Sequence, residues 1–201
     1  SGRASWHINS LYTEKTITPT AIPTTTTIDT LFSAKVYSIY LSPTGNDSND
    51  GLTRSTAIKS LAQAEKLLQT AKPQKNVEIR IAKGTYYDAN TMWHYSHPNF
   101  KTQFLPDDGK SPTAVRSQED MPIFDGKYVG KWLLHVKPKG GERSNIEFYY
   151  LTIQNYVTDG LTITNDLRDE SKWNGNNRFY GLHFQNIGNY WYTQYVKCPA
   201  S

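Results

Sequence analysis

The sequence contains only one cysteine, Cys198, among its 201 residues, so no intrachain disulfide can form. No apolar run reaches the roughly 20 residues that a membrane-spanning helix requires. The chain also lacks a run of lysine and arginine and a zinc-binding cysteine pattern, which argues against a nucleic-acid-binding protein. It starts at Ser1 rather than at a methionine, which is compatible with a signal peptide that has been removed or was never included, and the sequence does not show export directly.

The residues that are abundant favour strands and turns. The chain has 14 Tyr, 7 Phe and 5 Trp, together with many Thr and Asn. Hydrophobic residues make up 37% of the sequence, which suits an elongated fold with a thin core. The net charge of +4 is compatible with an acidic partner such as a uronate polysaccharide, and equally with no charged partner at all.

Two regions differ in composition. Residues 1–35 are rich in Thr and Pro, which disfavour helix, and they are predicted to form an extended arm or linker. Residues 36–201 are predicted to form the folded domain. Its first strand is predicted from Val36 to Leu41, and a cluster of turn-forming residues follows at 44–51.

A short helix and a second strand are predicted next. Ser60 and Gln63 form a capping-box pair at the start of the helix, which ends before Pro73. Its apolar face is formed by Leu61, Ala64, Leu68 and Ala71. Apolar residues then alternate with others over 77–81, which predicts a strand, and the chain turns at 83–86.

These patterns resemble the N-terminal segment of the pectate-lyase-like superfamily. The resemblance rests on residues 40–51, on the helix start Lys59-Ser60-Leu61 and on the turn at 81–86. It is close over about residues 36–87 and looser afterwards, and Ala57-Ile58 stands where the superfamily usually has a proline. The resemblance implies an all-β fold, a right-handed parallel β-helix (solenoid) whose open end is covered by a short N-terminal capping α-helix.

An internal repeat supports the prediction of a solenoid. Residues 145–155 align with residues 176–186 at a constant offset of 31, pairing Phe148 with Phe179 and Asn155 with Asn186. The two asparagines are predicted to form a hydrogen-bonded ladder. Because Tyr149 and its repeat partner alternate with the phenylalanines, one pair faces inward and the other outward, and the sequence leaves open which. The chain ends soon after a repeat begins, so we expect a truncated solenoid without a complete active site.

Two segments are predicted to be insertions between strands, Asp88–Pro122 and Thr164–Asn177. The second contains acidic, basic and aromatic side chains of the kinds that bind sugars. The predicted substrate-binding residues are Arg168, Lys172, Trp173, His183 and Trp191. The predicted ligands of a calcium ion are Asp166, Asp169 and Glu170. A solvated, salt-bridged loop would have the same composition, and His183 is also compatible with an ordinary surface histidine.

Two other polar groups are interpreted as structural. Asn46, Asp47, Asn49 and Asp50 are predicted to form a turn rather than a metal site. His94 and His97 have a spacing compatible with a metal pair, but no third ligand is evident.

The resemblance implies a secreted or cell-surface protein that acts on a polysaccharide. Lyases of this superfamily neutralise a uronate carboxylate, often with Ca²⁺, and a basic residue removes the neighbouring proton. The alternative is a non-catalytic glycan-binding β-helix, such as an adhesin or a tail-spike-like structural protein. The sequence leaves the catalytic residues and the oligomeric state open.

Overall fold

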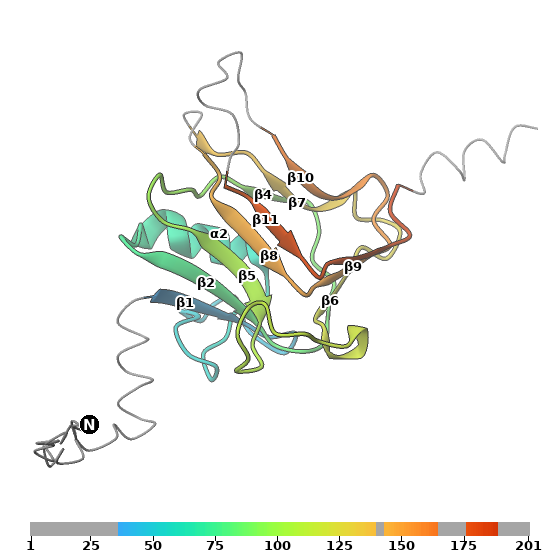
Figure 1. Cartoon of the computed structure of the whole chain (residues 1–201), viewed down its shortest axis with the longest axis horizontal. Coiled ribbons are helices and arrows are strands. Elements are labelled where there is room, and N and C mark those ends of the chain that lie inside the picture. Colours follow the sequence, from blue (N-terminus) through green and yellow to red (C-terminus); the bar gives the residue numbers. More distant parts are fainter. Residues whose placement is uncertain (1–35, 140–142, 165–175, 189–201) are drawn as a thin grey trace, which may run out of the picture.

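The computed structural model describes residues 36–139, 143–164 and 176–188, and its strands form three parallel sheets (Figure 1). Sheet A contains, in spatial order, β1 (Val36–Leu41), β2 (Asn76–Ile81), β5 (Thr102–Pro106), β8 (Ile146–Tyr149) and β11 (Arg178–Tyr180). Sheet B contains β3 (Thr85–Tyr86), β6 (Ile123–Asp125), β9 (Thr152–Gln154) and β12 (His183–Gln185). Sheet C contains β4 (Thr91–Trp93), β7 (Trp132–Val136) and β10 (Asp159–Ile163). The helices are α2 (Leu61–Ala71) and the short 3-10 helix η1 (Gln118–Asp120).

From β2 onward the chain visits sheets A, B and C in turn, and every strand pair is parallel. The prediction of an all-β fold built from parallel strands is therefore confirmed. The predicted repeat is also confirmed, because Phe179 pairs with Phe148 and Gln185 with Gln154, as the sequence alignment of the two segments requires.

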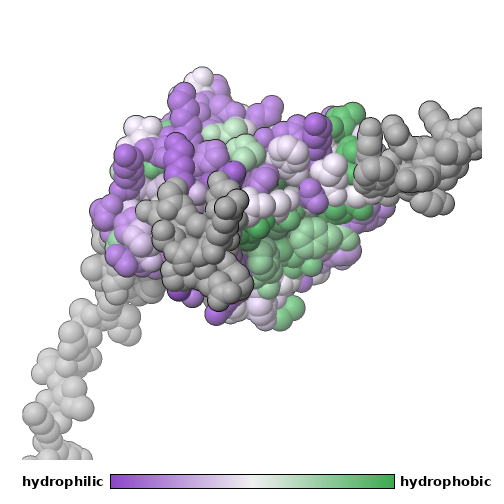
Figure 2. Space-filling model, turned by 90° about the horizontal axis from the view of Figure 1, so that it is seen from above, coloured by the Kyte–Doolittle hydropathy of each residue, from purple (hydrophilic) through white to green (hydrophobic). Residues whose placement is uncertain are grey.

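Inward-facing side chains form rows that run from strand to strand across the sheets. In sheet A the row contains Ile39, Ile79, Phe104, Phe148 and Phe179. The ring centroids of Phe104 and Phe148 lie 4.6 Å apart, and those of Phe148 and Phe179 lie 5.7 Å apart, with nearly parallel planes. The phenylalanines are thus the inward pair and the tyrosines the outward pair. Figure 2 shows hydrophobic surface bordered by hydrophilic surface, and Phe179 remains 51% exposed.

The turns between sheets repeat the same backbone conformation. Positive φ angles recur at equivalent positions of the repeat, at Asn145 and Asn176 (44° and 63°), Tyr150 and Gly181 (49° and 63°), and Asn155 and Asn186 (60° and 54°). Asparagine tolerates this left-handed region better than most residues. The Asn186 side-chain amide donates to Asn155 Oδ1 at 3.0 Å, so the predicted ladder is confirmed. A second ladder joins Asn176 to Asn145 at 3.2 Å.

Helix α2 begins as predicted, with the Ser60 hydroxyl accepting a hydrogen bond from the Gln63 backbone N–H at 3.1 Å. Its Leu61, Ala64 and Leu68 side chains are buried in the same core as the sheets. Ala71 is exposed, contrary to the prediction, because the chain leaves the helix at Lys72 in a left-handed conformation.

The end of the molecule at which β1 and β4 lie is covered by its own chain. On the outer edge of β1, the Tyr40 N–H donates to the Gly51 carbonyl at 2.8 Å, and its carbonyl accepts from Ile58 at 2.9 Å. Next to β4, the buried Glu65 carboxylate of α2 accepts the backbone N–H groups of His94 and Tyr95, at 2.9 and 3.1 Å. The Tyr40 backbone on the edge of β1 and the two N–H groups that follow β4 are therefore satisfied by the chain itself.

The prediction of one long insertion over Asp88–Pro122 was wrong. This stretch contains β4 and β5, and only residues 107–121, which include η1, lie between strands of sheets A and B. The two strands lack a clear alternation: β4 has three residues, and β5 ends in Leu105-Pro106, both of them buried. The predicted arm, residues 1–35, lies outside the described residues.

Candidate functional site

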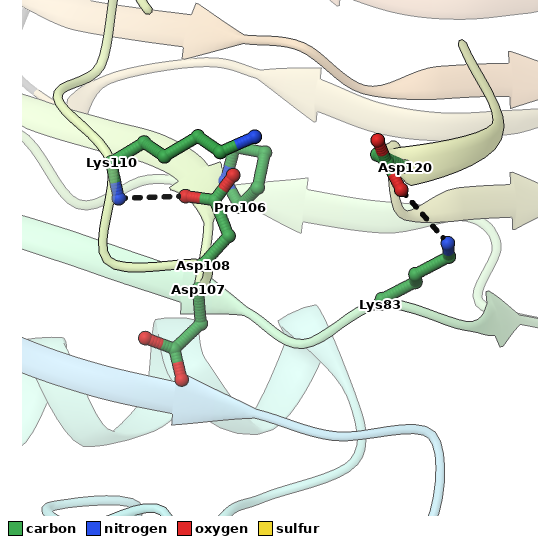
Figure 3. A pocket seen from close by; sticks show the side chains of 6 residues that line it. All are labelled: Lys83, Pro106, Asp107, Asp108, Lys110 and Asp120. Carbon is green, nitrogen blue, oxygen red and sulfur yellow. Dashed lines mark hydrogen bonds and ion pairs between the residues drawn. The ribbon is translucent and has the colours of Figure 1, made fainter. Parts of the chain in front are cut away.

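A pocket of about 160 Å³ lies where β2 and β5 end side by side in sheet A (Figure 3). Because the strands are parallel, their carboxyl ends meet at one edge, so the turn after β2 and the segment after β5 face each other. Lys83 comes from the turn, and the 107–121 segment contributes the other charged residues. The lining residues are Lys83, Pro106, Asp107, Asp108, Lys110 and Asp120.

The 107–121 segment folds around the guanidinium of Arg116, whose side chain is fully buried. Arg116 Nε and Nη2 donate to the two carboxylate oxygens of Asp108, at 2.6 and 2.9 Å. The remaining donors reach the backbone carbonyls of Ser111, Pro112 and Ala114, at 3.2, 3.3 and 2.7 Å. A planar guanidinium can satisfy several acceptors at once, and it therefore holds this segment in one conformation.

The same segment covers part of the outer face of sheet A. Leu105, Met121, Tyr149 and Tyr150 form a second buried apolar cluster on this side. The guanidinium carbon of Arg116 lies 5.0 Å from the centre of the Tyr150 ring, a cation–π contact. Tyr149 faces outward yet is buried, because Met121 of the 107–121 segment packs in the same cluster.

The carboxylates of the pocket point in different directions. Figure 3 shows the Asp107 carboxylate directed away from Lys110 and Asp120. Asp107 accepts two hydrogen bonds from Arg54, at 2.6 and 2.9 Å. Asp120 accepts from Ser117 Oγ at 2.8 Å and pairs with Lys83 Nζ at 3.0 Å. Each of these carboxylates is therefore already neutralised or hydrogen-bonded by a neighbour.

For Asp108 and Asp120, these partners favour the ionised carboxylate. The hydrogen bonds from Arg116 lower the pKa of Asp108 against the opposing effect of burial. The hydrogen bond from Ser117, together with Lys83, lowers the pKa of Asp120. Lys110 forms no ion pair with the described residues, and Figure 3 shows its side chain extending across the pocket toward the side of Asp120. Its ammonium group is the pocket's available positive charge.

The arrangement suits hydrogen bonding to a polar ligand better than metal binding. Within the described ranges, no group of three or more His, Cys, Asp or Glu side chains is placed to hold a metal ion. The three aspartates of the pocket already accept hydrogen bonds from arginine, lysine or serine side chains, so their oxygens are not arranged to coordinate calcium. Charged donors and acceptors around a space of this size can hydrogen-bond the hydroxyl and carboxylate groups of a sugar.

The outer face of sheet A carries a buried carboxylate, Glu147, which pairs in register with Gln103 of β5. It accepts hydrogen bonds from Lys101 Nζ at 2.5 Å, from Gln103 Nε2 at 2.7 Å and from the Tyr149 hydroxyl at 2.6 Å. Burial alone would raise the pKa of Glu147, but these three donors outweigh it and hold the pKa below its ordinary value. The ionised form is thus the one that the fold stabilises.

Because of Glu147, the unfolding free energy of the protein should decrease as the pH falls into the acidic range. A carboxyl whose pKa is lower in the folded state stabilises the fold above its ordinary pKa, and this contribution is lost as the pH falls through the folded-state pKa. We expect Glu147→Gln to reduce the unfolding free energy at pH 7 by about 2 kcal/mol, because charged hydrogen bonds are lost. Its melting temperature should then fall less between pH 6 and pH 3 than that of the wild type.

The control for this experiment is Glu119→Gln, since Glu119 is exposed. The melting temperatures of the wild type, Glu147→Gln and Glu119→Gln are measured across this pH range by thermal unfolding followed by circular dichroism. Parallel pH profiles for wild type and Glu147→Gln would contradict the assignment.

Of the residues predicted to bind substrate or metal, the structure describes only His183. It starts β12, where Phe184 pairs with Ile153 in the core, so His183 lies on the outer side of sheet B and is half-buried. It does not line the pocket of Figure 3. The residues that lie outside the described part are Arg168, Lys172, Trp173, Trp191, Asp166, Asp169 and Glu170.

The two polar groups interpreted as structural have structural partners. Asp47 accepts the backbone N–H groups of Lys59 and Ser60, at 2.8 and 2.9 Å, so it fixes the turn that leads into α2. The His94 ring is hydrogen-bonded to the Lys137 carbonyl at 2.8 Å, and that of His97 to Gln74 Oε1 at 3.1 Å. The turn interpretation is confirmed, and the two histidines do not form a metal pair.

The sequence predictions missed the residues that build the pocket. Asp108, Lys110, Arg116 and Asp120 stand in a polar stretch whose Pro, Gly and Asp content is that of a surface loop. The available signal was Arg116, shortly after an Asp-Asp-Gly-Lys turn, but the sequence cannot show that it is buried.

Comparison with models of known protein families, with curated proteins and with solved structures gives no match. Within the described residues, no helix is long and apolar enough to span a membrane.

Proposed function

We propose that this chain belongs to a right-handed parallel β-helix protein that binds an acidic polysaccharide outside the cell. The observation that carries the proposal is the pocket of Figure 3, where Lys110 has no ion pair among the described residues and faces a space suited to one sugar ring. A uronate unit offers hydroxyl groups for the aspartates and a carboxylate for the lysine. The net charge of +4 is compatible with such a ligand.

The β-helix part of the proposal is supported by the order in which the sheets are visited. Three parallel sheets, a strand register that follows the sequence repeat and recurring turn conformations are what a coiled stack requires. The right hand is proposed because crossover connections between parallel strands of one sheet are almost always right-handed. Helix α2, packed at the end beside β1 and β4, would then be the cap of the stack.

An elimination reaction on the uronate is the second candidate. It would require Lys110 in its neutral amine form as the base that takes the proton next to the carboxylate, in place of the ammonium form that pairs with that carboxylate. A calcium ion remains a prediction that rests on Asp166, Asp169 and Glu170. No step is assigned to it, because the pocket carboxylates do not fit a metal.

Binding is tested with the chain and three soluble polymers by isothermal titration calorimetry. We expect polygalacturonate or alginate to bind and neutral dextran not to bind, with an affinity that falls as salt is added. Lys110→Ala should weaken binding by about tenfold, the change that about 1.4 kcal/mol produces. Lys66→Ala, which removes an exposed lysine of α2, is the matched control.

The outcomes separate the two candidate functions. Equal binding of acidic and neutral polymers, or no binding of any, would refute the proposal. Growth of ultraviolet absorbance from an unsaturated product, lost in Lys110→Ala, would establish the lyase.

A further inference from the structure

A second surface with exposed aromatic and basic side chains lies at the turn between β6 and β7. In this turn, Gly126-Lys127-Tyr128-Val129-Gly130, both Lys127 and Tyr128 have positive φ angles, 52° and 59°. This conformation is uncommon for a residue as large as tyrosine, and strained backbone of this kind is often found at functional sites. Apart from Lys72 and Tyr150, the other positive-φ positions of the described residues are asparagine or glycine.

The glycines at both ends fix this turn against the body of the protein. A Cβ on Gly126 would lie 2.6 Å from the ring of Tyr156, and one on Gly130 would lie 2.7 Å from Ala89. The Tyr128 backbone N–H donates to Asn155 at 2.8 Å, and its hydroxyl accepts from Asn186 at 3.1 Å. Lys127 and Tyr128 are therefore held in place.

The side chains presented here are aromatic, basic and exposed. Tyr128 is 55% exposed and Tyr87 is 63% exposed, which is unusual for such large rings. Lys127 Nζ lies 3.6 Å from the centre of the Tyr87 ring, so the cation occupies one face of that ring.

Tyr87 stands between two hollows of the surface. The first, of about 160 Å³, lies against the turn and is lined by Tyr87, Asn90, Asp125 and Lys127, among others. The second, of about 380 Å³, is lined by Tyr87 and Lys59 and also by the carboxylates of Asp47 and Asp88. The carboxylates of both hollows accept hydrogen bonds from the protein itself: Asp47 and Asp88 from backbone N–H groups, and Asp125 from side-chain amides. Each hollow thus combines the shared tyrosine ring with one lysine and with carboxylates that already have partners.

We infer that these two hollows bind two consecutive sugar units of an acidic glycan. The Tyr87 ring contacts the apolar C–H face of a sugar, and Lys127 and Lys59 each face the carboxylate of one unit. A polymer with a carboxylate on every sugar matches this repetition. The choice of an acidic glycan rests on the proposed function, but the surface is separate from the pocket of Figure 3.

The test uses calorimetric titration of the intact chain with short oligogalacturonates. Tyr87→Ala should weaken binding by at least about threefold, the range expected for the loss of an aromatic contact. Tyr87→Phe, which keeps the ring, should bind like the wild type. The double variant Lys59→Glu, Lys127→Glu should lose binding of the acidic oligomer. The control is Leu52→Ala, which removes an exposed apolar side chain from another turn.

Tyr128→Asn distinguishes a functional turn from an accidental one. Asparagine accepts the left-handed conformation more readily, so this variant should melt at a higher temperature. It also removes the exposed Tyr128 ring next to Lys127, so it should bind the oligomer more weakly. If the wild type binds while Tyr87→Ala and the double lysine variant bind equally well, the inference is wrong and the proposed function stands. If the wild type binds no acidic oligomer or polymer, both are wrong.

Discussion

Phe148→Ala is expected to lower the unfolding free energy by about 3–5 kcal/mol, the range measured for large-to-small changes at buried phenylalanines. The ring is 1% exposed and lies in the middle of the inward row of sheet A, between Phe104 and Phe179. Its removal leaves a cavity that neighbouring strands cannot fill, because their backbone hydrogen bonds fix the spacing of the row. The loss should therefore be near the upper part of this range.

The repeat supplies a matched control for this experiment. Phe179 occupies the equivalent position in the next repeat and pairs with Phe148, but it is 51% exposed. Phe179→Ala should cost about 1–2 kcal/mol, since only part of its apolar surface is buried. Urea unfolding followed by tryptophan fluorescence measures both. Equal losses for the two variants would contradict the assignment of Phe148 to the centre of the core.

Arg116→Ala is expected to release the 107–121 segment from sheet A. The change leaves Asp108 and three backbone carbonyls without their donor. Removal of one partner of a buried ion pair costs about 3–5 kcal/mol, and we expect the lower end because the Asp108 side chain is 27% exposed. The loss falls first on the segment itself, which can open while the sheets stay folded.

Limited proteolysis with mass spectrometry detects this local opening. New cleavage sites between residues 107 and 121 should appear in Arg116→Ala at protease concentrations that leave the wild type intact. Lys83→Ala is the control, because Lys83 also pairs with an aspartate of this segment, Asp120, yet both side chains are exposed. It should leave the cleavage pattern of the wild type unchanged. Identical cleavage patterns for both variants would argue against the anchoring role of Arg116.

The parts of the fold that the sequence predicted are those determined by local chemistry. The Ser60 cap and the strand at 77–81 each follow from a few neighbouring residues. The repeat added long-range information, because its constant offset also gives the strand register. The strands β4 and β5 were missed because burial on both faces, or a short length, removes the alternation that identifies a strand.

The candidate site was predictable to a smaller extent. Its residues come from two turns that are adjacent because β2 and β5 pair, and pairing between strands that are distant in the sequence is not encoded locally. The residues around Arg116 in the sequence do not show whether its side chain is buried or solvated. Of the predicted site residues, the outward position of His183 follows from alternation in β12, whereas its distance from the charged pocket depends on the whole stack.

The covered edge of β1 bears on association between molecules. A bare strand edge can pair with the edge of another chain and so start a fibre. On β1, the Tyr40 N–H and carbonyl are already hydrogen-bonded to Gly51 and Ile58 of the same chain. An incoming strand would have to displace these two contacts before it could extend sheet A from β1, so this edge is protected against strand addition.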